Sequence, residues 1–397
     1  MKVVIAMDSF KGSMTSLEAG EAAKAGILRA VPDAEVIVRP LADGGEGTME
    51  SLIYALHAAP QKETVTGPLG TPVTASYAVA AAAGAETAAP ANTGGTAVLD
   101  MASTSGLILV PEAQRDPMKT TTRGLGELIL AAAKNGCRDF LIGIGGSATN
   151  DAGAGMLAAL GVSLLDANGQ PISDGAQGLR TLARIDAATI APVIRDCRFR
   201  IICDVTNPLC GRNGASYVYG PQKGASPDLC AELDSLLAHF AELTEHAMAQ
   251  GPAQLPLADT PGAGAAGGLG YAFLAYLNAK LLPGIDVVLD VTRLEDYLKD
   301  ADILLTGEGR IDAQTANGKA PAGAAALAKK HGLTVLAFAG LVEVGEDDAA
   351  KLHAAGIDSW YAITPSEMPQ DKAKQPDTAK ANMAAAAERV FQQIVIG

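Results

Sequence analysis

Five loops of the chain combine glycine with an acidic side chain, and each follows a stretch whose apolar residues predict a β-strand. They cover residues 8–13, 42–48, 145–155, 204–216 and 307–319. Ligands of open α/β sheets bind beyond the carboxyl ends of the strands, so loops in this position are expected to meet on one face. They would gather the acidic residues Asp8, Asp43, Glu46, Asp151, Asp204, Glu308 and Asp312 and the basic residues Lys11, Arg310 and Lys319.

Carboxylates, cations and glycine backbone in one place are the groups that phosphoryl transfer requires. A Mg²⁺ ion takes one or two carboxylates together with phosphate oxygens, and a lysine or arginine neutralises the phosphoryl group in transit. A further carboxylate accepts the proton of the attacking hydroxyl. A single acidic residue of this kind more often caps a helix or a turn, so it is the coincidence of five loops that indicates a shared active site.

The loop after the apolar run 140–144 is the one that most needs an explanation. It offers three successive candidate helix caps at residues 149–151, and Gly153 and Gly155 then fall in the first turns of a predicted helix. Each glycine there costs about 1 kcal/mol relative to alanine, which is tolerated where something must approach the backbone closely. Either an anion binds at this helix N-terminus, or the loop is a tight turn packed against its own sheet.

The histidines and cysteines narrow the chemistry. The histidines (57, 239, 246, 331 and 353) lie in alanine-rich or amphipathic helical stretches, which disfavours a Ser-His-Asp triad or a histidine zinc site. The cysteines (137, 197, 203, 210 and 230) form no CxxC pair and are odd in number. Reduced thiols in a cytoplasmic protein are therefore expected.

Composition sets the wider frame. The 397 residues suffice for two or three domains, and 48% hydrophobic with only 4% aromatic residues suits an α/β protein with closely packed helices. A formal net charge of −14 argues against nucleic-acid and anionic-membrane partners. The N-terminal apolar run reaches Asp8 too soon for a signal peptide, and no apolar run approaches the length of a membrane span.

The elements that must position the loops show two styles. The ends of the chain alternate strands and helices, as in the strand 2–7, the helix 16–30 with a capping box of Thr15 and Glu18, and the strand 35–41. The middle predicts short, more antiparallel strands. There we expect strands at 64–66, 71–79 and 86–89 and a helical stretch at 96–103. The regular alternation returns near residue 283, with a strand expected at 287–289.

These patterns predict an α/β fold of two domains. Residues 1–65 plus 285–397 would form a discontinuous, Rossmann- or flavodoxin-like parallel-sheet domain. Residues 66–284 would form an inserted mixed α/β domain that carries the Gly-Gly-Ser-Ala-Thr-Asn-Asp loop. A string of three domains is the alternative.

One competing interpretation is a dehydrogenase. Residues 143–148 fit the relaxed dinucleotide fingerprint G-x-G-x-x-A, and Asp166 ends a predicted strand at about the expected distance. Against it, Asp151 would place a carboxylate near the pyrophosphate, and no histidine is placed for hydride chemistry. A Walker-type P-loop is excluded, because the chain contains no G-x-x-x-x-G-K-[ST].

Six motifs carry a family resemblance. They are Asp8-Ser-Phe-Lys-Gly-Ser13, Ala42-Asp-Gly-Gly-Glu-Gly-Thr48, Gly143-Ile-Gly-Gly-Ser-Ala-Thr-Asn-Asp151, Cys203-Asp-Val-Thr-Asn-Pro-Leu-Cys-Gly211, Gly220-Pro-Gln-Lys-Gly-Ala225 and Thr306-Gly-Glu-Gly-Arg-Ile-Asp312 with Gly318-Lys319. In this order, across nearly the full chain, they resemble the class I glycerate kinase family. Met7, Ala152 and Arg212 depart from the family pattern, where Pro, Gly and Pro are usual, and they flank the polar residues without replacing them.

The resemblance implies ATP- and Mg²⁺-dependent phosphorylation of D-glycerate, with 2-phosphoglycerate as the favoured product. It also implies two α/β domains with the site in the cleft between them. The resemblance does not fix the role of each residue.

Residue chemistry supplies the hypotheses about roles. The base would be Asp204 or Asp151, each with an amide neighbour in Asn207 or Asn150, and Lys11 would assist catalysis. Asp8, Ser9 and Arg310 would complete the glycerate site, and Mg²⁺ would bind Asp43, Glu308 and Asp312. The nucleotide would be held by Gly145, Gly146, Ser147, Gly264, Gly267, Gly268 and Lys319. A non-catalytic metabolite sensor on the same scaffold is the remaining rival.

Overall fold

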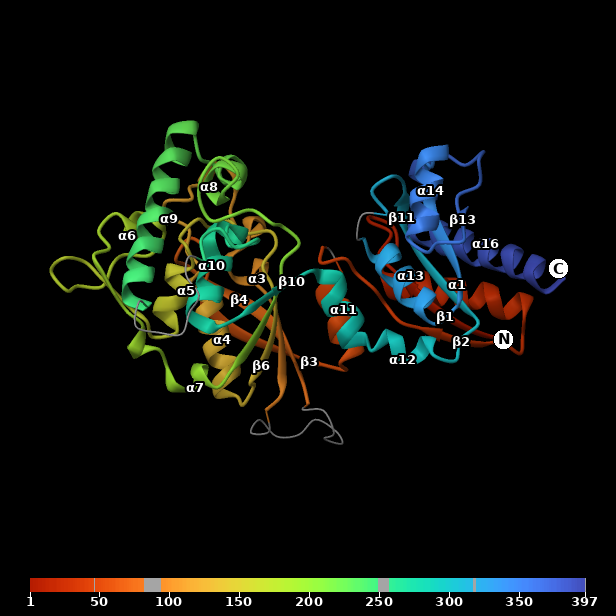
Figure 1. The fold of residues 1–397 in the computed structure, drawn as a ribbon, viewed down its shortest axis with the longest axis horizontal. Coiled ribbons are helices and arrows are strands. Elements are labelled where there is room, and N and C mark those ends of the chain that lie inside the picture. Colours follow the sequence, from red (N-terminus) through yellow and green to blue (C-terminus); the bar gives the residue numbers. More distant parts are fainter. Residues whose placement is uncertain (46, 82–93, 249–256, 317–318, 397) are drawn as a thin grey trace. The chain divides into compact units, whose positions relative to one another are not determined.

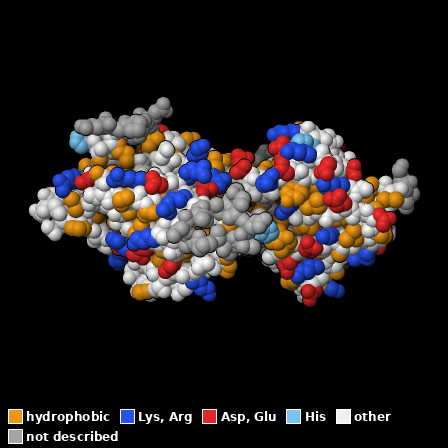
Figure 2. Space-filling model, turned by 90° about the horizontal axis from the view of Figure 1, so that it is seen from below, with side chains coloured by type: hydrophobic (Ala, Val, Ile, Leu, Met, Phe, Trp, Pro, Cys, Tyr) orange, Lys and Arg blue, Asp and Glu red, His pale blue; other side chains and the backbone are white. Residues whose placement is uncertain are grey.

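The computed structural model describes residues 1–45, 47–81, 94–248, 257–316 and 319–396, so Glu46 and the expected strand 86–89 lie outside the described residues. The chain divides into two compact units (Figure 1). Unit 1 comprises Met1–His57 and Pro283–Gly397, and unit 2 comprises Ala58–Leu282. Acidic and basic side chains are interspersed on the face of each unit shown in Figure 2, as is typical of a surface that meets water.

Unit 1 is built on a five-stranded parallel sheet of order β13-β12-β11-β1-β2. From that order the strands are Ser359–Ala362, Thr334–Val342, Ile303–Ile311, Lys2–Met7 and Glu35–Val38. Strand β1 is apolar after Lys2, and β11 begins with the apolar residues 303–305, because both faces of a parallel sheet are covered by helices. This arrangement confirms the expected α/β fold class.

Helices cover the unit 1 sheet on both faces (Figure 1). Helix α1 (Ser16–Ala30) and helix α16 (Pro376–Ile396) pack against each other, and their side chains share a core with β1 residues such as Ile5. Helix α13 packs against β11 and β12. The other helices of the unit are α2 (Thr48–Ala55), α11 (Gly284–Thr292), α12 (Leu294–Leu298), α13 (Ala320–Lys330), α14 (Glu346–Ala354) and α15 (Gln370–Ala373).

Unit 2 contains a six-stranded mixed sheet of order β10-β9-β6-β5-β4-β3. From that order the strands are Lys280–Leu282, Arg198–Ile202, Asp139–Gly143, Thr96–Asp100, Pro72–Ala80 and Ala59–Thr66. The first four run parallel, and β4 and β3 are antiparallel. A separate two-stranded sheet pairs β7 (Ser163–Leu165) with β8 (Arg184–Asp186).

Three helices of unit 2 are longer than the others. The long ones are α4 (Arg123–Lys134), α9 (Pro227–Met248) and α10 (Ala265–Leu277). Five short helices join them, together with single 3-10 turns at 107–109, 112–114, 187–189 and 221–223; the helices are α3 (Ala102–Ser105), α5 (Ala154–Ala159), α6 (Ala176–Leu179), α7 (Pro192–Arg195) and α8 (Ala215–Tyr219).

The structure corrects two predicted elements. Residues 96–103 are not one helical stretch, because Thr96–Asp100 is strand β5 in the interior of the sheet and only a one-turn helix follows. Residues 287–289 are not a strand, because they lie inside helix α11. Both errors concern short apolar runs, which periodicity alone cannot assign to a strand or a buried helix.

The expected domain limits and one loop also need correction. Residues 58–65 belong to unit 2, because β3 pairs with β4 along its whole length. Unit 2 ends at Leu282, and unit 1 resumes at Pro283. Strand β11 continues to Ile311, so the polar loop after it begins later than residue 307.

A run of left-handed backbone opens helix α10. Ala266, Gly267 and Gly268 have φ values of 52°, 72° and 89°, and they interrupt the helix at its first turn. A Cβ on Gly267 would overlap the Thr149 carbonyl oxygen, and the Gly267 carbonyl accepts the Ala152 N–H at 3.0 Å. This segment therefore packs closely against the loop that follows β6 and bonds to it.

We predict that Gly267→Ala lowers the thermal unfolding midpoint of the protein much more than Gly169→Ala. Gly169 also has a left-handed φ, +77°, but a Cβ there would meet nothing within 4 Å. The Gly169 variant should lose about 1–2 kcal/mol from backbone strain alone, whereas the Gly267 variant adds a steric overlap worth roughly 2 kcal/mol more. Equal losses in calorimetry would show that the close approach is not a constraint.

Candidate functional site

A cavity of about 400 Å³ lies in unit 1 beyond the carboxyl ends of its strands. The loops after β1 and β2, the ends of β11 and β12 and the segment after β13 all contribute to its wall. Eight of the residues predicted for the site line it: Asp8, Ser9, Lys11, Asp43, Glu308, Arg310, Asp312 and Lys319. We refer to it as the carboxyl-edge pocket.

Asp8 is the buried acid of this pocket. It follows β1 directly, is 5% exposed, and its Oδ1 accepts the Ser9 N–H at 2.6 Å. Burial raises the pKa of Asp8 to about 7, and the charges of Asp43 and Glu308 add to this, while the Ser9 N–H and Lys11 oppose it. A carboxyl group that titrates near neutrality is suited to accept a proton.

Glu308 and Lys319 form a tight pair in the same pocket. The Glu308 Oε1 accepts the Thr315 hydroxyl at 2.7 Å, and Oε2 lies 3.1 Å from the Lys319 Nζ. Burial raises the pKa of Glu308 despite these two partners. Arg310 lies differently, because its half-exposed guanidinium pairs with Glu343.

The predicted metal ligands are not a preformed three-carboxylate cluster. Among the described residues, no group of three or more His, Cys, Asp or Glu side chains is arranged to hold a metal ion. Asp43 accepts the Gly45 N–H at 3.1 Å, and both Asp43 and Glu308 are close enough to Asp8 to influence its charge. This donor set fits a magnesium ion that takes only one or two protein carboxylates and completes its shell with phosphate and water.

Asp151, predicted as a base, lies fully buried in unit 2. Its Oδ2 accepts the Thr122 N–H and hydroxyl, both at 2.9 Å, and the Gly155 N–H at 3.3 Å, while Oδ1 accepts the Gly153 N–H at 3.1 Å. Burial raises the pKa of this carboxyl against the effect of those donors. The geometry indicates that Asp151 anchors its loop to the start of α4.

Lys223 is a buried cation that the sequence hypotheses did not use. It is 1% exposed, and its Nζ donates to the Thr149 carbonyl at 2.7 Å. Burial lowers the pKa of Lys223 to about 7, and the nearby Asp151 charge opposes the shift. Its motif, Gly220 to Ala225, was visible in the sequence, but nothing in a 3-10 turn of lysine and glycine indicates burial.

Asn150 and Asn207, predicted for glycerate, are both held by their own unit. The Asn150 Nδ2 donates to the Ser216 hydroxyl at 3.0 Å, and its buried Oδ1 has no hydrogen-bond partner within the described part of the chain. Asn207 accepts the Tyr219 hydroxyl at 2.6 Å and donates to the Asn213 carbonyl at 2.7 Å. Asp204 lies exposed after β9.

The glycines predicted for nucleotide binding fall into two groups. Gly145 and Gly146 are exposed, and a Cβ on Gly145 would meet nothing within 4 Å. Within the described residues, the N–H groups from Gly145 to Ser147 donate to no backbone acceptor. By contrast, Gly264, Gly267 and Gly268 are buried, and close packing within unit 2 accounts for each of them.

The dehydrogenase alternative is not supported. In a dinucleotide fingerprint the helix begins within the glycine motif, so that its N-terminus faces the pyrophosphate. Here the helix after Ala148 begins only at Ala154 and has 6 residues. The family comparison below also gives a different class.

The fold and its carboxyl-edge pocket, with acids and cations at strand ends, define an α/β enzyme. In the described part of the chain, no helix is long and apolar enough to cross a membrane. A family model described as the glycerate kinase family matches residues 3–395. The chain belongs to this family, and it is therefore a kinase.

Individual relatives agree with that assignment. The chain is 44% identical to the glycerate 2-kinase of Escherichia coli (strain K12) over 397 residues, which is 100% of this chain and 99% of the relative. It is 45% identical to the glycerate kinase of Bacillus subtilis (strain 168) over 373 residues, covering 94% and 93% of the two chains. A crystal structure from Salmonella typhimurium LT2 named for glycerate kinase 2 superposes with a TM-score of 0.86 at 42% identity, over 100% of this chain and 99% of the other.

The raised pKa of Asp8 predicts a pH-dependent gain of stability in Asp8→Asn. Its folded pKa of about 7 lies above the usual value of 3.8, so the native protein holds a proton that the unfolded chain releases between these values. The proton on Asp8 stabilises the wild-type protein fully below about pH 4, and this contribution is lost as the pH rises through about 7. The variant should match the wild type near pH 4 and exceed it by up to about 4 kcal/mol above pH 8. A difference independent of pH, measured by denaturant unfolding, would contradict this.

The anchoring role of Asp151 predicts that Asp151→Asn destabilises the protein. The amide nitrogen would face donors that now bind a carboxylate, at a cost of roughly 2–4 kcal/mol. Asp204→Asn is the control, because Asp204 is exposed and its replacement should leave the thermal midpoint nearly unchanged. An Asp151→Asn protein with normal thermal stability but no turnover would instead restore Asp151 as the base.

Proposed function

We propose that this chain transfers the γ-phosphoryl group of ATP to the 2-hydroxyl of D-glycerate in a magnesium-dependent reaction, giving 2-phosphoglycerate and ADP. Family membership supports glycerate as the acceptor, and the name of the Escherichia coli relative favours the 2-position. The observation that carries the proposal is the carboxyl-edge pocket, which combines a buried acid of pKa about 7 with lysines and further carboxylates.

Asp8 is the first candidate for the proton acceptor. It takes the proton of the glycerate hydroxyl as that oxygen bonds to the γ-phosphorus and the bond from phosphorus to the bridging oxygen of ADP breaks. Its pKa near 7 lets it be ionised before the reaction and protonated after it. Asp204 remains the alternative suggested by the sequence, whereas the enclosed carboxylate of Asp151 is poorly suited to meet a substrate.

The cations of the pocket differ in whether they already pair with a carboxylate. Lys11 forms no salt bridge with any described residue, so it is the candidate for the glycerate carboxylate, with Ser9 beside it. Lys319, held by Glu308, would contact the phosphoryl group, and Arg310 would have to leave Glu343 to assist. The N–H groups of Gly145, Gly146 and Ser147, which donate to no backbone acceptor within the described residues, are the candidates for the nucleotide phosphates.

Asp43 and Glu308 are the residues that would hold magnesium, with Asp312 acting through water. When bound, the ion neutralises charge on the phosphate oxygens of the nucleotide. Glu308 already accepts two hydrogen bonds, so its oxygens are oriented before any ligand arrives.

The cysteines support a reducing, cytoplasmic location as part of the same proposal. Cys137, Cys197, Cys203, Cys210 and Cys230 are all free thiols. Free thiols persist where glutathione and thioredoxin keep them reduced. Thiol labelling immediately after cell lysis would reveal oxidised cysteines if the location were an oxidising one.

Incubation with ATP, Mg²⁺ and D-glycerate, followed by phosphorus NMR, tests the reaction. We predict a 2-phosphoglycerate signal, and a 3-phosphoglycerate signal would overturn the proposed position. Asp8→Asn should lower kcat about 10²-fold or more with little change in KM, while Lys11→Met should mainly raise the KM for glycerate. If Asp204→Asn loses turnover and Asp8→Asn does not, Asp204 is the base.

A further inference from the structure

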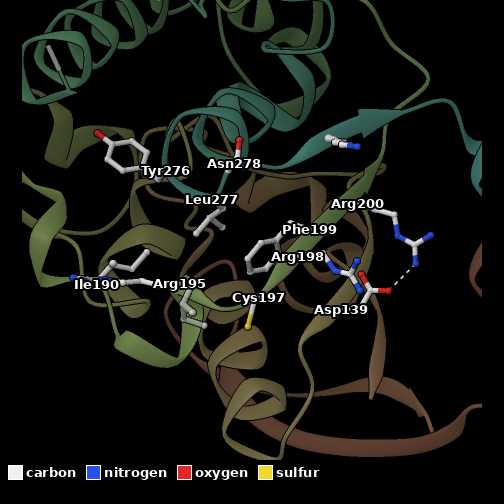
Figure 3. A pocket seen from close by; sticks show the side chains of 12 residues that line it. Asp139, Ile190, Arg195, Cys197, Arg198, Phe199, Arg200, Tyr276, Leu277 and Asn278 are labelled. Carbon is white, nitrogen blue, oxygen red and sulfur yellow. Dashed lines mark hydrogen bonds and ion pairs between the residues drawn. The ribbon is translucent and has the colours of Figure 1, made fainter. Parts of the chain in front are cut away.

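A second cavity, of about 670 Å³, lies in unit 2 at the amino-terminal edge of its sheet. Asp139, Arg198 and Lys280 line it, and each is the first residue of its strand, β6, β9 or β10. Arg195 from the end of α7 and Arg200 of β9 also reach it. Figure 3 shows Asp139, Arg195, Arg198 and Arg200 among the side chains that line this cavity. We call it the amino-edge pocket.

The amino-edge pocket is cationic in a strongly acidic chain. Four cationic side chains line it with one carboxylate, whereas the whole chain has a formal net charge of −14. Asp139 neutralises only Arg200, at 2.7 Å, and the Arg195 guanidinium donates to the neutral carbonyl of Ala188. Within the described residues, neither Arg198 nor Lys280 forms a salt bridge. Unbalanced arginine and lysine charge of this kind attracts anions.

Apart from Cys197 and Asn278, the rest of the pocket wall is apolar or aromatic. Arg198, Arg200 and Lys280 lie on one face of the sheet by register, and Phe199 alternates to the other. There Phe199 stacks on Phe140 at 5.0 Å between ring centroids, which fixes its position. The remaining apolar lining residues are Ile190, Ile194, Tyr276 and Leu277. A ligand that uses the whole pocket must therefore carry both an anionic group and an apolar part.

The amino-edge pocket is separate from the loops proposed for the nucleotide. Those loops leave β6 and β9 at their carboxyl ends, after Gly143 and Ile202. The pocket lies at the other ends of the same strands, and a strand of 5 residues spans about 13 Å. No step of the phosphoryl transfer proposed above uses these residues.

We infer that the amino-edge pocket is a second, non-catalytic binding site for a small organic phosphate that has an apolar portion. Its volume falls in the range of pockets that bind small organic molecules. Arg198 suits the oxygens of a phosphate group, because its guanidinium presents paired donors that match them, and Lys280 adds a second positive charge. Asp139 limits affinity, since its carboxylate occupies Arg200 and repels the ligand.

Phenyl phosphate is the test probe, because it joins a phosphate to an apolar ring. By isothermal titration of the full chain we expect phenyl phosphate to bind at least 5-fold more tightly than inorganic phosphate, and phenol not to bind. The double variant Arg198→Met with Lys280→Met should weaken phenyl phosphate binding at least 10-fold. Lys134→Met, an exposed lysine on α4 outside the pocket, is the matched control and should change nothing. Lys11→Met, in the carboxyl-edge pocket, should also leave this binding intact.

Asp139→Asn supplies a gain-of-binding test that misfolding cannot imitate. It removes the one carboxylate of the pocket and with it the repulsion of an anionic ligand, so phenyl phosphate should bind about 3- to 10-fold more tightly. Binding that is lost in Lys11→Met, or that is unchanged in both the double variant and Asp139→Asn, would overturn the inference. Absence of any binding by the wild-type chain would overturn it as well.

Discussion

In unit 2, the buried carboxylate of Asp151 holds the base of the loop that follows β6, and the tip of that loop carries the exposed glycines. Asp151 collects four donors from Thr122, Gly153 and Gly155, so the chain on both sides of it is held to the start of α4. Lys223 donates a hydrogen bond to Thr149, and the left-handed segment at Gly267 packs against Thr149 as well. Because the base of the loop is fixed in this way, its tip at Gly145 and Gly146 can remain exposed without losing its shape. Burial of Asp151 and Lys223 costs free energy, which the hydrogen bonds that each makes to neighbouring residues offset.

Unit 1 uses charge differently. Its parallel strands end at one edge, so side chains from distant parts of the sequence, such as Asp8 and Glu308, become neighbours. Burial raises the pKa of both carboxyl groups, and for Glu308 the hydrogen bonds from Thr315 and Lys319 oppose the shift. One edge of the sheet therefore holds two acids whose pKa values are raised by burial and opposed by different partners.

The sequence was most informative where local rules decide the structure. The capping box of Thr15 and Glu18 is confirmed, and so is the α/β fold class. Glycine and carboxylate at predicted strand ends indicated eight residues that the structure brings into one pocket. Short apolar runs failed as a guide at β5 and α11, because the same residues fit a strand or a buried helix until their neighbours are known.

Features that depend on tertiary packing were not accessible from the sequence. Nothing in the residues around Lys223 distinguishes a buried lysine from an exposed one, and the glycines from 264 to 268 look like a phosphate cradle although they serve close packing. The amino-edge pocket was missed for the opposite reason. Arg198 and Lys280 lie at the amino ends of their strands, whereas ligands of parallel sheets are expected at the carboxyl ends.

Both pockets answer the same electrostatic requirement. An acidic chain repels an anionic substrate at long range, so each place that takes an anion must concentrate cations locally. The carboxyl-edge pocket does this with lysines set among carboxylates, an arrangement that also suits a magnesium ion and proton transfer. The amino-edge pocket has three arginines and one carboxylate, so it lacks the acids that chemistry would need and retains only the capacity to bind. The proportion of acidic to basic side chains therefore suits the carboxyl-edge pocket to a reaction and the amino-edge pocket to binding alone.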